Sequence, residues 1–198
     1  MELPDTDSEI GVYPIKNPAD FRKYITSIEP NISNIIFANK VIFVEGPDDL
    51  LAYKLVLSGE IVLGLKNITI VSAGGKDPIR TLVQLCKNFE ISFFVIHDWD
   101  LPDKTIDVSL DKDKTESVYN KLSKEDKAQY TKNHKIIKLC GDELVHQNKI
   151  NLEEVLSIKN KGNGSLEIFE KLNGETITQV EKEYPGLIAD NLKAFLKN

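Results

Sequence analysis

The sequence predicts an α/β fold: a parallel sheet of about four strands flanked by helices, with a polar insertion and C-terminal helices. Short apolar segments rich in β-branched residues alternate with longer segments whose apolar residues have helical spacing. The short segments are hydrophobic almost throughout, which is typical of strands buried on both faces. Their connections are long enough for right-handed parallel crossovers, so we expect a three-layer arrangement.

The first strand is expected at residues 41–46, VIFVEG, a short and β-branched apolar run. The Gly-Pro step that follows ends this strand. Asp48 or Asp49 can then cap a helix that Gly59 closes. This part of the chain therefore predicts a strand followed directly by a helix.

The second strand is expected at residues 67–73, NITIVSA, and is followed by a pair of glycines. A second helix is predicted over residues 78–89, because proline is favoured in the first helical turn. Residues 91–98, ISFFVIHD, are again apolar almost throughout and predict the third strand. The order up to this point is β-α-β-α-β.

The next segment, residues 101–134, is rich in Lys, Asp and Glu and predicts a polar insertion that is partly helical over 116–130. The apolar pattern resumes at residues 134–140, HKIIKLC, where we expect the fourth strand. From Asn151 onward the sequence predicts two or three amphipathic helices. They begin at NLEEVLSI, SLEIFEKL and GLIADNLKAFL, and KNKGNGS forms a loop between the first two.

Three parts of the chain follow from this pattern. Residues 1–30 are expected to be irregular, punctuated by prolines, with a short helix around residues 20–28. The α/β core is expected over residues 31–156 and includes the polar insertion. Residues 157–198 form a C-terminal helical appendage.

The composition excludes a membrane protein. No apolar run reaches the roughly 18 to 20 residues that span a bilayer. The acidic and polar N-terminus is not a secretory signal. Cys86 and Cys140 lie in apolar stretches without a metal-ligand spacing, which indicates buried, reduced thiols and a cytoplasmic location.

The net charge of −6 argues against a freestanding DNA-binding protein, because proteins that neutralise phosphates tend to be basic. A metal-dependent nuclease is compatible with this charge, since it concentrates carboxylates around ions that reverse the local sign. A partner domain or subunit could also supply a basic groove.

Acidic residues follow two of the expected strands. Glu45 ends the first strand, Asp98 ends the third, and Asp100 lies two positions further along. Ligands bind outside the carboxyl ends of strands in open α/β sheets. Asp98 and Asp100 share a side if the extended conformation continues, and Asp49 can point back toward the strand end. Carboxylates that repel one another in this way favour a hard cation such as Mg²⁺.

Each of these residues also has a simpler interpretation. A glutamate at a strand end is usually solvated, and Asp49 alone is more often a helix cap than a ligand. His97 is interpreted as a satisfied core histidine, and Trp99 as exposed or packing. The joint pattern, VEGPDD after one apolar strand and HDWD after another, favours the metal site.

This joint pattern resembles the Toprim domain, which has a Glu-Gly pair after its first strand and Asp-x-Asp after its third. Glu45-Gly46 and Asp98-Trp99-Asp100 match those positions. The segment NIIFANKVIFVEGPDD is most similar to the OLD (overcoming lysogenisation defect) nucleases, which carry a second acid at the position of Asp49. NLEE is similar to a later acidic element of that family, with Glu153 as the matching acid and Glu154 as the alternative. The resemblance covers residues 32–156.

The resemblance implies a Toprim-like, Rossmannoid fold and a Mg²⁺-dependent (or Mn²⁺-dependent) endonuclease or nickase that uses two ions on DNA. It implies Glu45, Asp98 and Asp100 as catalytic residues, with Asp49 and Glu153 as additional metal ligands. Lys76, after the glycine pair, is a candidate for binding a substrate phosphate, although a solvated loop lysine is the simpler interpretation. The family also uses a basic residue nearer the C-terminus, for which the candidates are Lys161, Lys171, Lys182 and Lys193.

One departure concerns the ATPase that OLD proteins generally carry. This chain has no G-x-x-x-x-G-K-[ST] motif, so we expect an ATPase domain or subunit as a partner. A standalone Toprim RNase and a non-catalytic nucleic-acid-binding Toprim module remain alternatives. A homodimer through the apolar C-terminal helices is also compatible with the sequence.

Overall fold

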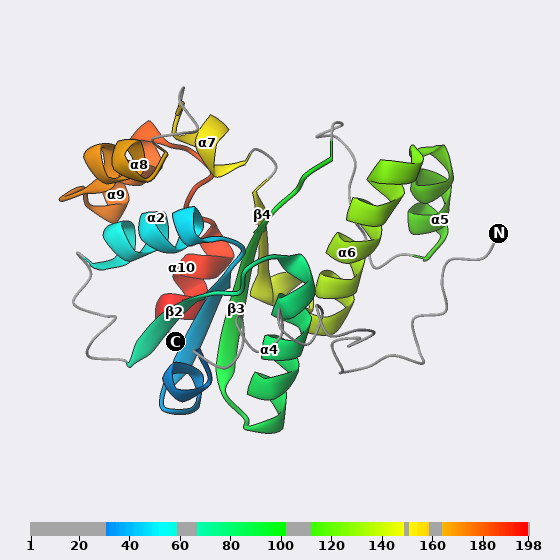
Figure 1. Ribbon diagram of the computed structural model, residues 1–198, viewed down its shortest axis with the longest axis horizontal. Coiled ribbons are helices and arrows are strands. Elements are labelled where there is room, and N and C mark those ends of the chain that lie inside the picture. The colour runs from blue at the N-terminus through cyan, green and yellow to red at the C-terminus, as the bar shows by residue number, and fades with distance from the viewer. Residues whose placement is uncertain (1–30, 59–66, 102–111, 149–150, 159–163, 198) are drawn as a thin grey trace, which may run out of the picture.

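The structure is a computed structural model that describes residues 31–58, 67–101, 112–148, 151–158 and 164–197 (Figure 1). The irregular segment expected at residues 1–30, with its short helix, lies outside these described residues. So does most of the loop expected between the first two C-terminal helices. Within the described segments, no helix is both long and apolar enough to cross a membrane.

Four parallel strands form one sheet in the described part of the chain, in the order β2-β1-β3-β4. This confirms the predicted fold class, and the first three strands lie where the sequence placed them. The chain leaves β1 in one direction to form β2 and then returns on the other side to form β3. The point where the order reverses therefore lies between β1 and β3, where open α/β sheets bind ligands. The strands are Lys40–Val44 (β1), Ile68–Ser72 (β2), Ser92–Asp98 (β3) and Val145–Asn148 (β4).

Helices connect and cover these strands (Figure 1). The helices that follow β1 and β2 lie close to their predicted positions. Residues 31–36, before β1, are also helical. The helices are α2 (Pro47–Ser58), α4 (Lys76–Asn88), α5 (Lys112–Lys121), α6 (Lys124–Cys140), the 3₁₀ helix η1 (Asp142–Leu144), α7 (Leu152–Val155), α8 (Gly164–Leu172), α9 (Ile177–Glu183) and α10 (Asp190–Lys197).

Alternate residues of β1 point into two separate hydrophobic cores, as strand geometry requires. Val41 and Phe43 pack in the core on one face of the sheet, which includes buried side chains of α4 and α6. Ile42 and Val44 pack on the other face, in a core shared with α2 and helices α7 to α10. The three-layer arrangement is thus present, and the C-terminal helices complete one of its outer layers.

The fourth strand was predicted in the wrong place. Residues 134–140 are not a strand but the last two turns of α6, which begins after Ser123, whose side chain accepts a hydrogen bond from the Asp126 N–H. The buried residues of α6 are Tyr130, Asn133, Ile136 and Ile137, a helical spacing that is hidden when HKIIKLC is considered alone. The true strand, β4, is VHQN, which is too short and too polar to be recognised from its sequence.

Two smaller corrections concern helix ends and the cysteines. α2 begins at Pro47, so Asp48 and Asp49 lie in its first turn rather than at its cap. Cys86 is buried as expected, whereas Cys140 is only partly buried; both are free thiols.

Helix α9 was not predicted from the sequence. Its start is nevertheless marked by a capping box between Thr176 and Gln179, a signal that the sequence does contain.

Candidate metal centre

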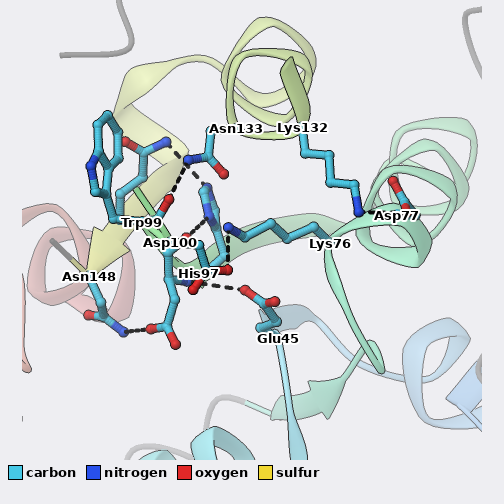
Figure 2. A network of polar contacts seen from close by, with 11 residues as sticks. Glu45, Lys76, Asp77, His97, Trp99, Asp100, Lys132, Asn133 and Asn148 are labelled. Carbon is cyan, nitrogen blue, oxygen red and sulfur yellow. Dashed lines mark hydrogen bonds and ion pairs between the residues drawn. The ribbon is translucent and has the colours of Figure 1, made fainter. Parts of the chain in front are cut away.

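Acidic side chains meet where β1 and β3 end, at the point where the strand order reverses. Glu45 follows β1 directly, and Asp98 is the last residue of β3. The Asp98 N–H donates a hydrogen bond of 3.2 Å to Glu45 Oε2, so the two strand ends are joined through a carboxylate (Figure 2). Burial raises the pKa of Glu45, the charge of Lys76 opposes that increase, and the charge of Asp100 adds to it.

Asp98 is also held from the neighbouring strand. Asn148 ends β4 and pairs in register with Asp98, and its Nδ2 donates to Asp98 Oδ1 at 3.3 Å (Figure 2). Burial first, and then the charges of Asp49, Glu45 and Asp100, raise the pKa of Asp98 to about 7. Asn148 was not predicted from the sequence, because it lies at the end of β4, the strand that the sequence pattern did not reveal.

Asp49 reaches back toward β1, as the sequence predicted. Its Oδ2 accepts a hydrogen bond of 2.9 Å from the N–H of Gly46, the residue just before α2. An acid in the first turn of α2 therefore satisfies a backbone donor at the start of that helix. A Cβ at Gly46 would lie 3.3 Å from the same oxygen, a tight contact that a larger residue would have to relieve by shifting Asp49. Asp49 is 8% exposed, and its pKa is raised to about 6, first by burial and then by the charges of Glu45 and Glu153.

Glu153 joins this group from the C-terminal side. It lies in α7, whose cap residue Asn151 accepts a hydrogen bond of 2.9 Å from the Glu154 N–H. The charge of Glu153 raises the pKa of Asp49, which places this acid in the electrostatic range of the others. The assignment of Glu153, with Glu154 as the alternative, stays a prediction. We refer to the five side chains below as the carboxylate cluster, whose members are Glu45, Asp49, Asp98, Asp100 and Glu153.

Asp100 enters the carboxylate cluster through a turn rather than through an extended strand. Its φ of 53° lies in the left-handed region, so the extended conformation that would align it with Asp98 does not continue. Trp99 is buried in the hydrophobic core, and Asn133 Nδ2 donates to the Trp99 carbonyl at 2.8 Å (Figure 2). Asp100 Oδ2 instead forms an ion pair of 2.9 Å with Lys76 Nζ.

His97 is the core histidine that the sequence predicted. It is buried, and its Nδ1 donates to the Asp98 carbonyl at 2.9 Å. Its Nε2 then accepts a 3.4 Å hydrogen bond from Gln147 Nε2. Burial lowers the pKa of His97 to about 3, so the ring is neutral and shapes the turn without acting as a charge.

The C-terminal lysines are placed only in part. Lys161 lies outside the described residues. Lys193 of α10 is held by Glu181 at 2.6 Å and by Asp190 at 2.7 Å. These carboxylates already balance its charge, so Lys193 is less available to act on a substrate.

The donor set of the carboxylate cluster fits a hard divalent cation. All five members offer carboxylate oxygens, the ligands that Mg²⁺ and Mn²⁺ prefer. Burial and mutual repulsion both raise the pKa of Asp49 and Asp98, and a bound cation would offset that cost. Among the described residues, no three carboxylate, histidine or cysteine side chains already converge closely enough to hold one ion. Side-chain rotation would therefore accompany binding.

Replacing Asn133 with alanine is expected to weaken Mg²⁺ binding about tenfold, because Asn133 orients the turn between two acids of the carboxylate cluster. The Trp99 carbonyl would lose its buried donor, at a cost of about 1 to 3 kcal/mol in the free energy of unfolding. Asn191→Ala is the matched control, since Asn191 Nδ2 donates to the Val145 carbonyl at 2.9 Å. Calorimetric titration and urea unfolding should show that both variants lose stability and only Asn133→Ala loses affinity. Equal affinities would contradict this role.

Comparison with known proteins adds two findings. Residues 36–100 match the family model described as "Overcoming lysogenization defect protein-like, TOPRIM domain". A protein of Thermus scotoductus named OLD nuclease is 32% identical over 127 residues. That match covers 64% of this chain but 23% of the relative. The family match includes four members of the carboxylate cluster and ends at Asp100.

Proposed function

We propose that this chain cleaves DNA as a metal-dependent endonuclease or nickase, because its residues 36–100 match the TOPRIM domain of the OLD-like family and because it is similar to an OLD nuclease over 127 residues. The observation that carries the proposal is the carboxylate cluster. The fold gathers acids from the ends of β1 and β3 and from α2 and α7 at one end of the sheet, where their charges raise the pKa of Glu45, Asp49 and Asp98. Such an arrangement is costly without a cation, and DNA cleavage is a chemistry that uses one.

We assign the acids to two groups of ligands, as the resemblance to the OLD nucleases suggests. Glu45, Asp49 and Glu153 would hold one ion, and Asp98 with Asp100 the other. The ions would lower the pKa of an attacking water and stabilise the negative charge on the reacting phosphate. The chain itself supplies the support for these ligands. Asn148 orients Asp98, and the N–H of Gly46 orients Asp49.

The partners are part of the proposal. The matched relative is much longer than the part this chain covers, and an ATPase domain or subunit would act together with the carboxylate cluster. The net charge of −6 supports this division, because a basic partner surface would provide the long-range attraction for DNA. DNA contact by the chain itself would then be confined to the metal centre.

The experiment is incubation of the purified chain with supercoiled plasmid or with structured RNA, in Mg²⁺, Mn²⁺, Ca²⁺ or EDTA. We expect nicking or linearisation of the plasmid in Mg²⁺ or Mn²⁺, complete loss in EDTA, and recovery when excess Mg²⁺ is restored. Cleavage that persists in EDTA would contradict the metal dependence. Preferential cleavage of RNA would favour the standalone RNase, and DNA binding without cleavage would favour the non-catalytic module.

A further inference from the structure

Lys76 is a buried lysine placed among acids. Its side chain is 3% exposed, and its Nζ lies 2.9 Å from Asp100 Oδ2. It begins α4, directly after two glycines whose φ angles of 75° and 125° turn the chain at the end of β2. The Gly75 N–H donates to the Glu45 carbonyl at 2.9 Å, which fixes this turn against the end of β1. The sequence GGK therefore positions an ammonium group inside the metal centre, not on a solvated loop.

This position is unfavourable for a lysine in two ways. A buried ammonium loses its hydration, and the first turn of a helix repels positive charge. Lys76 is stable there because the carboxylate cluster balances its charge. Among the effects that lower the pKa of Glu45, the charge of Lys76 is the largest, and Asp100 forms an ion pair with Lys76 directly.

We propose that Lys76 is a built-in counter-ion of the carboxylate cluster, which holds Asp100 when no divalent cation is bound and must release it for the cation to bind. This inference rests on the proposed function, because it takes the carboxylate cluster to be the metal centre. Lys76 is then a positioning residue that competes with the metal ion. It keeps the acids partly neutralised in the metal-free protein and lowers their affinity for the cation.

Removing the ammonium should therefore strengthen cation binding. We expect Lys76→Met to bind Mg²⁺, Mn²⁺ and Ca²⁺ about tenfold more tightly than the unchanged chain, because a like charge beside a divalent ion is removed. Methionine retains the apolar stem that packs in this buried position. Lys76→Arg should have the opposite effect, because its planar guanidinium can hold Asp100 through two hydrogen bonds and is harder to displace.

The measurement is calorimetric titration of each variant with the three cations. Fluorescence of Trp99, the one tryptophan of the chain, gives a second signal from between Asp98 and Asp100. Lys132→Met is the matched control. It removes the same charge, but Lys132 is half-exposed and pairs with Asp77 at 3.2 Å. Its charge is the smallest of the effects on the pKa of Glu45, so the affinity of this variant should change much less than that of Lys76→Met.

A double-variant cycle with Asp100→Asn separates competition from a general change in charge. The loss of affinity caused by Asp100→Asn should be larger in the Lys76→Met background, where Asp100 no longer has an internal partner. Unchanged or weaker cation binding in a folded Lys76→Met variant would overturn the inference while leaving the proposed function standing. If the unchanged chain binds none of the three cations, the proposed function itself fails.

Discussion

Replacing Glu45 with glutamine is expected to reduce metal-dependent DNA cleavage by roughly a thousandfold while leaving the fold intact. Glu45 lies at the point where the strand order reverses and contacts the end of β3 through the Asp98 N–H. The glutamine side-chain oxygen can still accept this hydrogen bond, so the junction of the two strands is retained. The negative charge that would hold a cation is lost. The initial rate of plasmid nicking measures the effect.

Glu143→Gln provides the control for this prediction. Glu143 is an exposed acid of η1, just before β4 begins. Because the strands are parallel, it lies near the end of the sheet opposite to the carboxylate cluster. It removes the same charge through the same chemical change, and we expect its nicking rate to stay within about twofold of the unchanged chain. Circular dichroism and urea unfolding should show both variants folded. A folded Glu45→Gln variant that cleaves normally would remove Glu45 from the metal centre.

The parts of the fold that the sequence predicted are those specified by local pattern. β1, β2 and β3 are apolar runs bounded by glycine, proline or acidic residues, and such runs are legible without knowing their neighbours. β4 is different, because VHQN becomes a strand only by pairing with the end of β3. The apolar end of α6 was mistaken for that strand, since its helical period is visible only together with Tyr130 and Asn133.

The residues of the candidate metal centre also fall into those that a local sequence pattern reveals and those that it does not. Glu45, Asp49, Asp98 and Asp100 were predicted because each follows a strand that the pattern revealed, and parallel strands bring their carboxyl ends together. The supporting residues depend on contacts between distant segments. Asn148 contacts Asp98 across 50 residues, and no local signal indicates that contact. The burial of Lys76 depends on a glycine turn packed against another strand, so the sequence alone suggested a solvated loop.

Asp98→Asn is expected to stabilise the protein at pH 8 in EDTA by about 2 to 4 kcal/mol in the free energy of unfolding. The reason is the pKa of Asp98, which burial raises from 3.8 to about 7. Between these two values the folded protein binds more protons than the unfolded chain, so its stability falls as the pH rises. At pH 8 the folded protein must keep a charged, half-buried carboxylate that the asparagine variant lacks.

Comparing the unchanged chain with the Asp98→Asn variant isolates the contribution of the Asp98 carboxyl group to stability. Burial lowers the pKa of His97 to about 3, which makes stability rise with pH up to the ordinary histidine range and opposes the effect of Asp98. This contribution is present in both proteins and cancels in their difference. The stabilising effect of Asp98→Asn should therefore shrink as the pH falls from 8 toward 4. Thermal unfolding at several pH values would measure it as a difference in Tm.

Mg²⁺ should reverse the order of the two stabilities. A cation that binds the folded state at a thousand times its Kd adds about 4.1 kcal/mol, which offsets the advantage of the asparagine variant, and the unchanged chain gains this more fully than a variant lacking a ligand. Asp190→Asn is the control, because Asp190 is an exposed acid whose pKa is lowered by Lys193, so its loss should not stabilise the protein at pH 8. If Asp98→Asn were no more stable than the unchanged chain in EDTA at pH 8, the charge on Asp98 would not destabilise the metal-free folded protein. The electrostatic argument for a metal ion at the end of β3 would then fail.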